Sequence, residues 1–346
     1  MDSRNQRILD CIIEQYIDTA EPIGSRAISK QLDLSLSAAT IRNVMADLTE
    51  MGLLCQPHTS AGRIPTDLAY RYYVQKTVAL LAQQPQKVDP QEASYTDEFA
   101  RRYQRLEDVL QDAADELTAS THCTGLALGP RPSTSKLKRV ELIGISQTQV
   151  LVVLVTQAGL VKNRIISFRE CPNQEDLNKI AQILVDHFVG LGIGEIQESL
   201  LETLAAEAQE LSAHAIRIGK KALELDATGE VFISGSANLC QYPEFSDHLN
   251  LQKVYQRIED KGQLYQMMDE LTQTEGLHIQ IGDENQKFGL QSCSVLASTY
   301  GSHDNLLGSI GVIGPTRINY PRVIQAINRS SRKLSWAVGH FLSPDR

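Results

Sequence analysis

The first quarter of the chain carries stretches of apolar residues with helical spacing, separated by turn signals. The first stretch predicts a helix over residues 4–18, because apolar side chains recur every three or four positions: Ile8, Leu9, Ile12 and Tyr16. Pro22 interrupts the pattern, and a short helix follows with Ser25 as its expected N-cap. Ser37 is expected to cap a longer helix, AATIRNVMADLTEM, which ends at Gly52.

A short β-hairpin is predicted directly after this longer helix. The residues LLCQP are expected to form one strand, HTSAGR a turn and RIPT the return strand. Thr66 is then expected to cap a further helix, DLAYRYYVQKTVALLA. Helix, turn, helix and hairpin in this order are typical of a winged helix-turn-helix domain, which we expect over residues 1–82.

The next part of the chain begins with a linker and a long helix. Residues 83–95 are polar and contain prolines, which predicts a linker. The helix is expected over about 96–119, where apolar residues are spaced alternately by four and three: Phe99, Tyr103, Leu106, Leu110, Ala113 and Leu117. This spacing fits a helix that packs into a core and a helix that forms a dimer seam equally well.

From residue 139 onward, short runs rich in β-branched residues predominate, which predicts a mixed α+β architecture. Three strands are expected first, namely RVELIGIS, QVLVVLVT and KNRIISF. Helices at about 174–191 and 198–225, a strand EVFISGS and one helix over QKVYQRIEDKGQLYQMMDELT follow. The C-terminal end is expected to hold three more strands, LHIQIG, GLQSCSVLASTY and LGSIGVIGP, and a helix that begins at Pro321.

The helix after Ser37 separates a buried face from a face that suits DNA. At about 100° per residue, one side carries the apolar residues Ile41, Val44, Met45 and Leu48. A recognition helix enters the major groove with its N-terminal end first, where Arg42 can read guanine and Asn43 can read adenine. The residues assigned to this interface are Ser37, Ala38, Ala39, Thr40, Arg42 and Asn43.

The hairpin turn supplies a second group of candidate DNA contacts. Hydroxyl groups and backbone amides of the turn can bond phosphates, and Arg63 can enter a minor groove or pair with phosphate. Gly62 is expected to adopt a left-handed conformation. This group comprises Ser25, Arg26, His58, Thr59, Ser60, Gly62 and Arg63. The tyrosines that follow, Tyr70, Tyr72 and Tyr73, are interpreted as packing residues rather than base stackers.

Charge narrows the DNA hypothesis to a local surface. The 346 residues carry a net charge of −9, which argues against indiscriminate polyanion binding. Cations nevertheless outnumber acids within 24–46 and again within 56–76, where Arg63, Arg71 and Lys76 face only Asp67. A small helical domain that contacts other proteins is the alternative interpretation of the same pattern.

The sequence does not favour a membrane protein, a metal or cofactor protein, or an enzyme. No apolar stretch is long enough to span a membrane and no apolar run follows a basic N-terminus, so a cytoplasmic protein is expected. The six cysteines and the histidines are too scattered to predict a metal site, and no cofactor is expected. Nucleophile-elbow, zinc-protease and phosphate-loop motifs are absent, which predicts that the protein is not an enzyme.

Three motifs, EPIGSRAISK, LSAATIRNVMADL and LLCQPHTSAGRIPTDLAYRYYV, closely resemble the N-terminal signature of the heat-inducible transcription repressor HrcA family. The resemblance is dense over residues 4–74 and the length of the chain also fits. The departures are mild: Ala38 stands where the family often has proline, Val44 replaces an acidic residue, and Leu68 and Ala69 replace a Lys-Gly pair.

The resemblance implies a dimeric repressor of chaperone operons that binds the inverted-repeat CIRCE operator and is relieved by heat. It also implies that the chaperonin is a partner which modulates the repressor. The implied fold is multidomain α+β, with a GAF-like domain from 96–139 and 226–346 and an inserted β-rich dimerisation domain at 140–225.

Several alternatives stay open at this point. The apolar region LIGISQTQVLVVLVTQAGLVKNRIISF is a candidate dimer interface, and ordinary sheet core explains it equally well. A winged-helix regulator whose GAF-like domain senses a metabolite is the nearest functional alternative. A scaffold protein in which the winged helix binds protein is the alternative from a different class.

Overall fold

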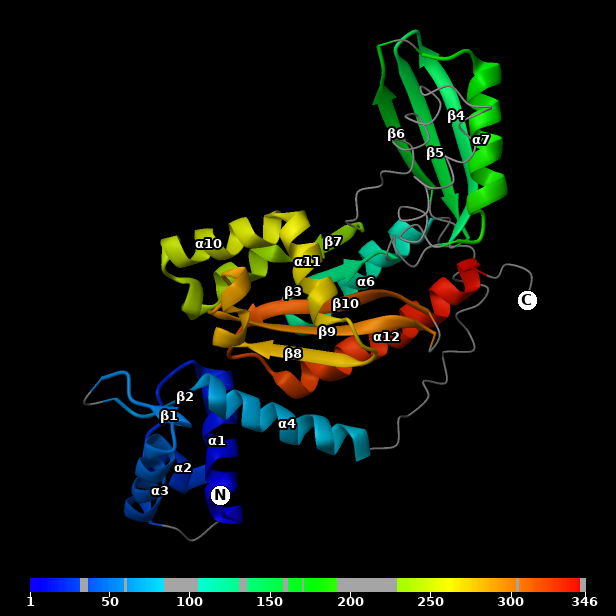
Figure 1. Cartoon of the computed structure of the whole chain (residues 1–346). Helices are drawn as coiled ribbons and strands as arrows, with labels where there is room; N and C mark the ends of the chain where they lie inside the picture. Colours follow the sequence, from blue (N-terminus) through cyan, green and yellow to red (C-terminus); the bar gives the residue numbers. More distant parts are fainter. Residues whose placement is uncertain are drawn as a thin grey trace.

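The computed structural model describes residues 1–31, 37–58, 61–83, 105–130, 136–157, 161–169, 171–191, 229–302 and 305–342. These residues form an N-terminal helical unit, a five-stranded sheet with helices on both faces, and a separate three-stranded sheet (Figure 1). Thr59, Ser60, most of the predicted linker and the helix predicted at 198–225 lie outside the described residues.

The N-terminal unit has the winged-helix order that the sequence predicts. Its elements are α1 (Ser3–Thr19), α2 (Ser25–Gln31), α3 (Ala38–Glu50), β1 (Leu54–Cys55), β2 (Ile64–Pro65) and α4 (Asp67–Gln83). The two strands pair antiparallel, with Leu54 opposite Pro65 and Cys55 opposite Ile64. The apolar faces of the helices meet in one core because their buried residues recur with helical spacing. The hairpin formed by β1, β2 and the turn between them is the wing of this domain.

The helix caps of this unit agree with the sequence at one position and differ at another. Ser37 caps α3 as predicted, since its hydroxyl accepts a hydrogen bond from the amide of Thr40 at 3.1 Å. The prediction for Ser25 was wrong, because α2 begins at Ser25 itself. The carbonyl of Gly24 accepts the first helical bond, from the amide of Ala27 at 3.0 Å, so the glycine occupies the capping position.

The C-terminal body is built on a five-stranded antiparallel sheet. Its strands lie in the order β7 (Val231–Ser234), β3 (Thr124–Leu128), β10 (Asn305–Pro315), β9 (Cys293–Ser302) and β8 (Leu277–Ile281). One face packs against α6 (Leu106–Thr121) and α12 (Tyr320–Leu342). The other face packs against α10 (His248–Glu259), α11 (Lys261–Leu271) and the short turns η3 (Ser236–Gln241), η4 (Pro243–Phe245) and η5 (Gly282–Phe288).

Two elements of the body differ from the prediction. Strand β3 was not predicted, because all five of its positions are buried and its sequence TGLAL shows no alternation. The single helix predicted over QKVYQRIEDKGQLYQMMDELT is broken into α10 and α11. The break occurs at Asp260, whose side chain accepts a hydrogen bond from the amide of Gln263 at 3.1 Å and so caps α11.

Helix α6 contains the second half of the helix predicted to have heptad spacing. Its apolar positions are buried in the core that α12 shares: Leu106, Leu110, Ala113 and Leu117. The core interpretation is therefore correct for this part, whereas Phe99 and Tyr103 lie outside the described residues. Within the described ranges, no helix is both long and apolar enough to span a bilayer.

Between β3 and β7, the described residues form a unit of their own outside the large sheet. Strands β4 (Leu137–Ser146), β5 (Gln149–Thr156) and β6 (Val161–Ser167) make an antiparallel sheet, and α7 (Gln174–Phe188) packs on one face. The three predicted strands are therefore confirmed. Because β3 and β7 are neighbours in the large sheet, this unit interrupts that sheet in sequence but not in space (Figure 1).

Candidate nucleic-acid interface

The two faces of α3 are those expected of a recognition helix. Its apolar residues are buried as predicted: Ile41, Val44, Met45 and Leu48. On the opposite side Ser37, Ala39, Arg42 and Asn43 are exposed, whereas Ala38 and Thr40 are half-buried. The N-terminal half of α3 therefore presents one guanidinium and one amide to solvent, with small residues before them that allow a close approach.

A hollow of about 390 Å³ lies between α2, α3 and the wing, and we call it the arginine hollow. Its charged lining residues are Arg26 from α2, Arg42 from α3 and Arg63 next to β2, and no carboxylate of the described residues lines it. Among the described residues, none of these arginines forms an ion pair. Cations without counter-charges create a positive potential, so the hollow suits an anion.

Arg63 lies at the base of the wing rather than at its free end. Its amide and carbonyl pair with the carbonyl and amide of Ile23, each at 2.9 Å. Its Nε donates a hydrogen bond to Thr49 Oγ1 at 3.1 Å, which brings the side chain against α3. The side chain amide of Gln56 donates to the carbonyl of Ala61 at 3.1 Å and braces the turn.

Glycine is required at position 62 because a Cβ would clash there, and not because the backbone is left-handed. Its φ lies outside the positive range, so the expected left-handed backbone was wrong. A Cβ at this position would lie 2.3 Å from the carbonyl oxygen of Ile23. The strand-like segment at Ile23 thus approaches the wing so closely that only glycine fits.

The remaining predicted contacts are distributed around this hollow. Ser25 lines it but is buried, whereas Arg26 is exposed at its rim. His58 is exposed in the turn, and its carbonyl accepts a hydrogen bond from the amide of Ala61 at 2.8 Å. The structure therefore brings Ser25, Arg26, Arg42, Gly62 and Arg63 together in one place, while Thr59 and Ser60 lie outside the described residues.

Two cations that the sequence analysis counted toward a basic surface are neutralised elsewhere. Lys76 forms an ion pair with Asp10 of α1. Arg71 pairs with Glu284 of the C-terminal body. The basic surface is consequently smaller than the charge count predicted.

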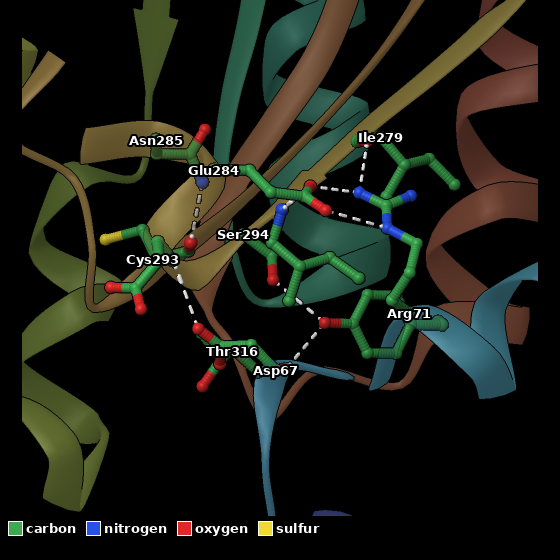
Figure 2. A network of polar contacts seen from close by, with 11 residues as sticks. Asp67, Arg71, Ile279, Glu284, Asn285, Cys293, Ser294 and Thr316 are labelled. Carbon is green, nitrogen blue, oxygen red and sulfur yellow. Dashed lines mark hydrogen bonds and ion pairs between the residues drawn. The ribbon is translucent and has the colours of Figure 1, made fainter. Parts of the chain in front are cut away.

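Helix α4 is joined to the C-terminal body by a set of polar contacts that we call the seam (Figure 2). Arg71 donates through Nε to Glu284 Oε1 at 2.9 Å and through Nη2 to the carbonyl of Ile279 at 2.8 Å. The amide of Asp283 donates to Asp67 Oδ2 at 3.1 Å. Burial, together with the nearby carboxylates of Asp283 and Glu284, raises the pKa of Asp67, while the Asp283 amide opposes the rise.

The seam also contains a buried arginine and an aromatic pair. Arg317, which is 8% exposed, donates through Nε to Glu244 Oε1 at 2.6 Å and through Nη1 to the carbonyl of Ile17 in α1. The rings of Tyr70 and Tyr320 lie 5.8 Å apart. A single apolar core runs from the winged helix into the body through this pair. The winged-helix unit is therefore packed against the body and not merely tethered to it.

The roles of Thr49, Gln56 and the residues of the seam were not predictable from the sequence. Thr49 lies inside the helix predicted after Ser37, and Gln56 lies inside the first predicted strand of the wing. Spacing and residue type therefore did not indicate that their side chains bond to Arg63 and to the carbonyl of Ala61. The partners that join the winged helix to the body are more than 200 residues apart along the chain, as Arg71 and Glu284 illustrate. Only folding brings such residues together.

Comparison with known proteins identifies relatives over nearly the whole chain. Residues 1–78 match the family described as "Winged helix-turn-helix transcription repressor, HrcA DNA-binding", and residues 107–324 match "HrcA protein C terminal domain". The heat-inducible transcription repressor HrcA of Geobacter sulfurreducens is 37% identical over 336 residues, which cover 96% of each chain. That of Symbiobacterium thermophilum is 33% identical over 339 residues, which cover 97% of this chain and 98% of the relative.

A solved structure is similar in fold. A crystal structure described as that of a hypothetical protein matches with a TM-score of 0.63 and 23% sequence identity, and the match covers 99% of both chains. At this identity the similarity supports the fold alone.

Proposed function

This chain belongs to the HrcA family of heat-inducible transcription repressors, and from this membership we propose that it represses chaperone operons by binding the inverted-repeat CIRCE operator as a homodimer. In this proposal heat relieves the repression, and the chaperonin modulates the activity of the repressor. Membership places the chain among transcription repressors that carry a DNA-binding winged helix.

The observation that carries the proposal is the arginine hollow beside the exposed face of α3. Arg42 and Asn43 point outward from the second turn of the helix, where a recognition helix meets base edges. Arg26 and Arg63 lie at the adjoining hollow, where they can bind phosphates that flank the groove. In this arrangement the helix reads bases while the wing and α2 fix the register of the protein on the duplex.

The architecture of the C-terminal part supports the proposal that the protein is a dimer with a GAF-like domain. A five-stranded antiparallel sheet covered by helices on both faces is consistent with a GAF-like domain. The unit from β4 to α7 is inserted between two neighbouring strands of that sheet, and we propose that it is the dimerisation domain.

The outer face of the inserted sheet is the proposed dimer contact. Alternate residues of β5 point into the core under α7, and the opposite face exposes Ile143 by 42%, Ile145 by 50% and Ile165 by 57%. Ile143, Leu151 and Ile165 are paired in register, so they form a continuous apolar row across the three strands. An apolar row on an open sheet is unfavourable in water, and a second copy could cover it. Dimerisation would supply the two-fold symmetry that an inverted repeat requires.

A charge placed in this row is expected to weaken the dimer. Ile165→Asp should raise the dissociation constant of the dimer at least about 100-fold, because a desolvated carboxylate would lie opposite an apolar partner. Sedimentation equilibrium over a range of concentrations measures this constant. Leu249→Asp is the matched control, since Leu249 is 67% exposed on α10 and lies away from the inserted sheet. Equal dissociation constants for both variants would remove the outer face from the dimer contact.

Loss of the Arg42 side chain tests the proposed reading of bases. Arg42→Ala should cost about 1–3 kcal/mol of operator binding and relax specificity at one base pair. Fluorescence anisotropy with operators substituted at single positions measures both effects. Asp47→Ala is the control, since it removes an exposed side chain one turn or more further along α3. A uniform loss on all duplexes would instead indicate that Arg42 contacts only phosphate.

The function as a whole is tested by binding to an inverted-repeat chaperonin-operon duplex and to a scrambled duplex. Anisotropy should be recorded at two salt concentrations, with and without chaperonin. Specific binding that chaperonin strengthens supports the repressor and its partner together. Specific binding that is indifferent to chaperonin favours a regulator controlled by a metabolite. If folded, dimeric protein binds neither duplex, the winged helix is a protein-binding scaffold and the proposal fails.

A further inference from the structure

The guanidinium of Arg63 is held more firmly than that of a typical surface arginine. Both backbone groups of Arg63 are paired with Ile23, so the start of its side chain is fixed. Its Nε is bonded to Thr49 Oγ1 at 3.1 Å, so the plane of the guanidinium is fixed as well. An arginine normally loses rotamer freedom when it binds a ligand, and here much of that loss has already occurred on folding.

Thr49 is suited to hold the guanidinium of Arg63 in place, because its hydroxyl donates one hydrogen bond and accepts another. Its hydroxyl donates to the carbonyl of Met45 at 2.7 Å, which fixes the direction of the proton. The oxygen lone pairs therefore face Arg63 and can only accept. Thr49 lies in the last turn of α3, beyond the residues proposed to meet base edges. Its contact with the DNA would thus be indirect, through Arg63.

The remaining nitrogens of Arg63 have no protein partner in the described residues that would compete with a ligand. Within the part of the chain that the structure describes, no carboxylate pairs with Arg63 and no acidic residue lines the arginine hollow. Arg26 of α2 lines the same hollow and is exposed. Two planar guanidinium groups at one hollow are suited to the tetrahedral oxygens of a phosphate, because each group can donate two parallel hydrogen bonds.

We propose that Thr49 is a positioning residue, which holds Arg63 so that Arg63 and Arg26 bind one backbone phosphate of the operator at the arginine hollow. This inference rests on the proposed function, because the phosphate belongs to the bound duplex. It adds to that function a residue outside the DNA interface and a division of labour, in which Arg42 contacts bases and the hollow contacts the backbone.

The inference is tested by a double-mutant cycle on the full-length protein. Operator binding is measured by anisotropy at several salt concentrations for wild type, Thr49→Val, Thr49→Ser, Arg63→Ala and the Thr49→Val/Arg63→Ala pair. Valine keeps the shape of threonine and removes the hydroxyl, whereas serine keeps the hydroxyl. Thermal unfolding of each variant establishes that it is folded at the temperature of the assay.

The expected results distinguish positioning from a general structural role. Thr49→Val should weaken binding about 3- to 10-fold on specific and scrambled duplexes alike, and Thr49→Ser should stay within about twofold of wild type. Arg63→Ala should reduce the slope of log K against log salt by about 0.9, the contribution of one phosphate. Once Arg63 is alanine, Thr49→Val should cause no further loss.

Two results would overturn the inference, and they are separate from each other. If wild type binds the operator but Thr49→Val binds equally well, or is equally harmful with and without Arg63, then Thr49 does not act through Arg63. If wild type itself binds no duplex, the proposed function fails and the phosphate site fails with it. The first result leaves the repressor function intact, so the two failures cannot be confused.

Discussion

Gly62→Ala is expected to abolish specific operator binding and to destabilise the winged helix by about 3 kcal/mol. The added Cβ would lie 2.3, 2.5 and 2.8 Å from the carbonyl oxygen, the carbonyl carbon and the amide nitrogen of Ile23. All of these are backbone atoms, so no side chain can rotate away. Relief requires that Ile23 and Arg63 separate, which breaks their two hydrogen bonds and moves Arg63 out of the arginine hollow.

The measurement pairs operator anisotropy with thermal unfolding followed by circular dichroism. Gly24→Ala is the matched control for stability, because no atom lies within 4 Å of a Cβ built there and its φ is not positive. This control should cost no more than about 1 kcal/mol, because its methyl group meets no atom and only the weaker N-cap preference of alanine counts. If Gly62→Ala unfolds and binds like wild type, the close approach of Ile23 to the wing is incorrect.

The second large effect is expected at the seam. Arg317→Ala should lower the free energy of unfolding by about 3 kcal/mol, which corresponds to a fall of roughly 10 °C in Tm. The substitution leaves Glu244, whose side chain is 23% exposed, without its cation. It also removes the donor to the carbonyl of Ile17 and the guanidinium that lies 6.0 Å from the ring centre of Tyr242. Removing one partner of a buried pair costs more than the pair contributed, because the other charge stays buried.

Fluorescence of Trp336, the single tryptophan, can follow this unfolding, since Trp336 packs against the shared core. Arg329→Ala is the control, because Arg329 is an exposed arginine of α12. A second variant separates charge burial from lost packing. Adding Glu244→Gln to Arg317→Ala should recover about 1 kcal/mol, since a neutral amide is cheaper to leave unpaired than a carboxylate. An unchanged Tm for Arg317→Ala would show that the contacts of Arg317 contribute nothing to stability.

The winged helix was predictable because its signals are local. Helical periodicity placed Ile41, Val44, Met45 and Leu48 on one face of α3, and the cap at Ser37 fixed where that helix begins. The prediction succeeded because each signal lies within a few residues of the backbone that it controls. The strands of the inserted unit were predictable for the same reason, as β-branched residues are concentrated in β4, β5 and β6.

Local signals failed where burial removes the contrast between faces. All positions of β3 are buried, so no alternation distinguished it from a loop or a helix segment. The break at Asp260 was missed because the apolar pattern continues across it, from Val254 and Ile258 to Leu264 and Met268. The side chain of Asp260 caps α11, and so the helix is interrupted there although the apolar pattern continues.

Three properties follow from the amino-acid sequence alone: the order of the winged-helix elements, the exposed face of α3, and the resemblance to a repressor family. These properties depend on side chain type and on spacing of four residues or fewer. Which arginines lie together depends on tertiary packing. The folded structure gathers Arg26, Arg42 and Arg63 around one hollow and pairs Arg71 with Glu284, although Arg63 and Arg71 count equally in the charge of residues 56–76. The structure also shows why position 62 must be glycine: Ile23 lies too close for a Cβ, and the backbone is not left-handed. The physical reason is that charge pairing and steric exclusion depend on distance in space, which for residues far apart in the chain is set only when the core packs.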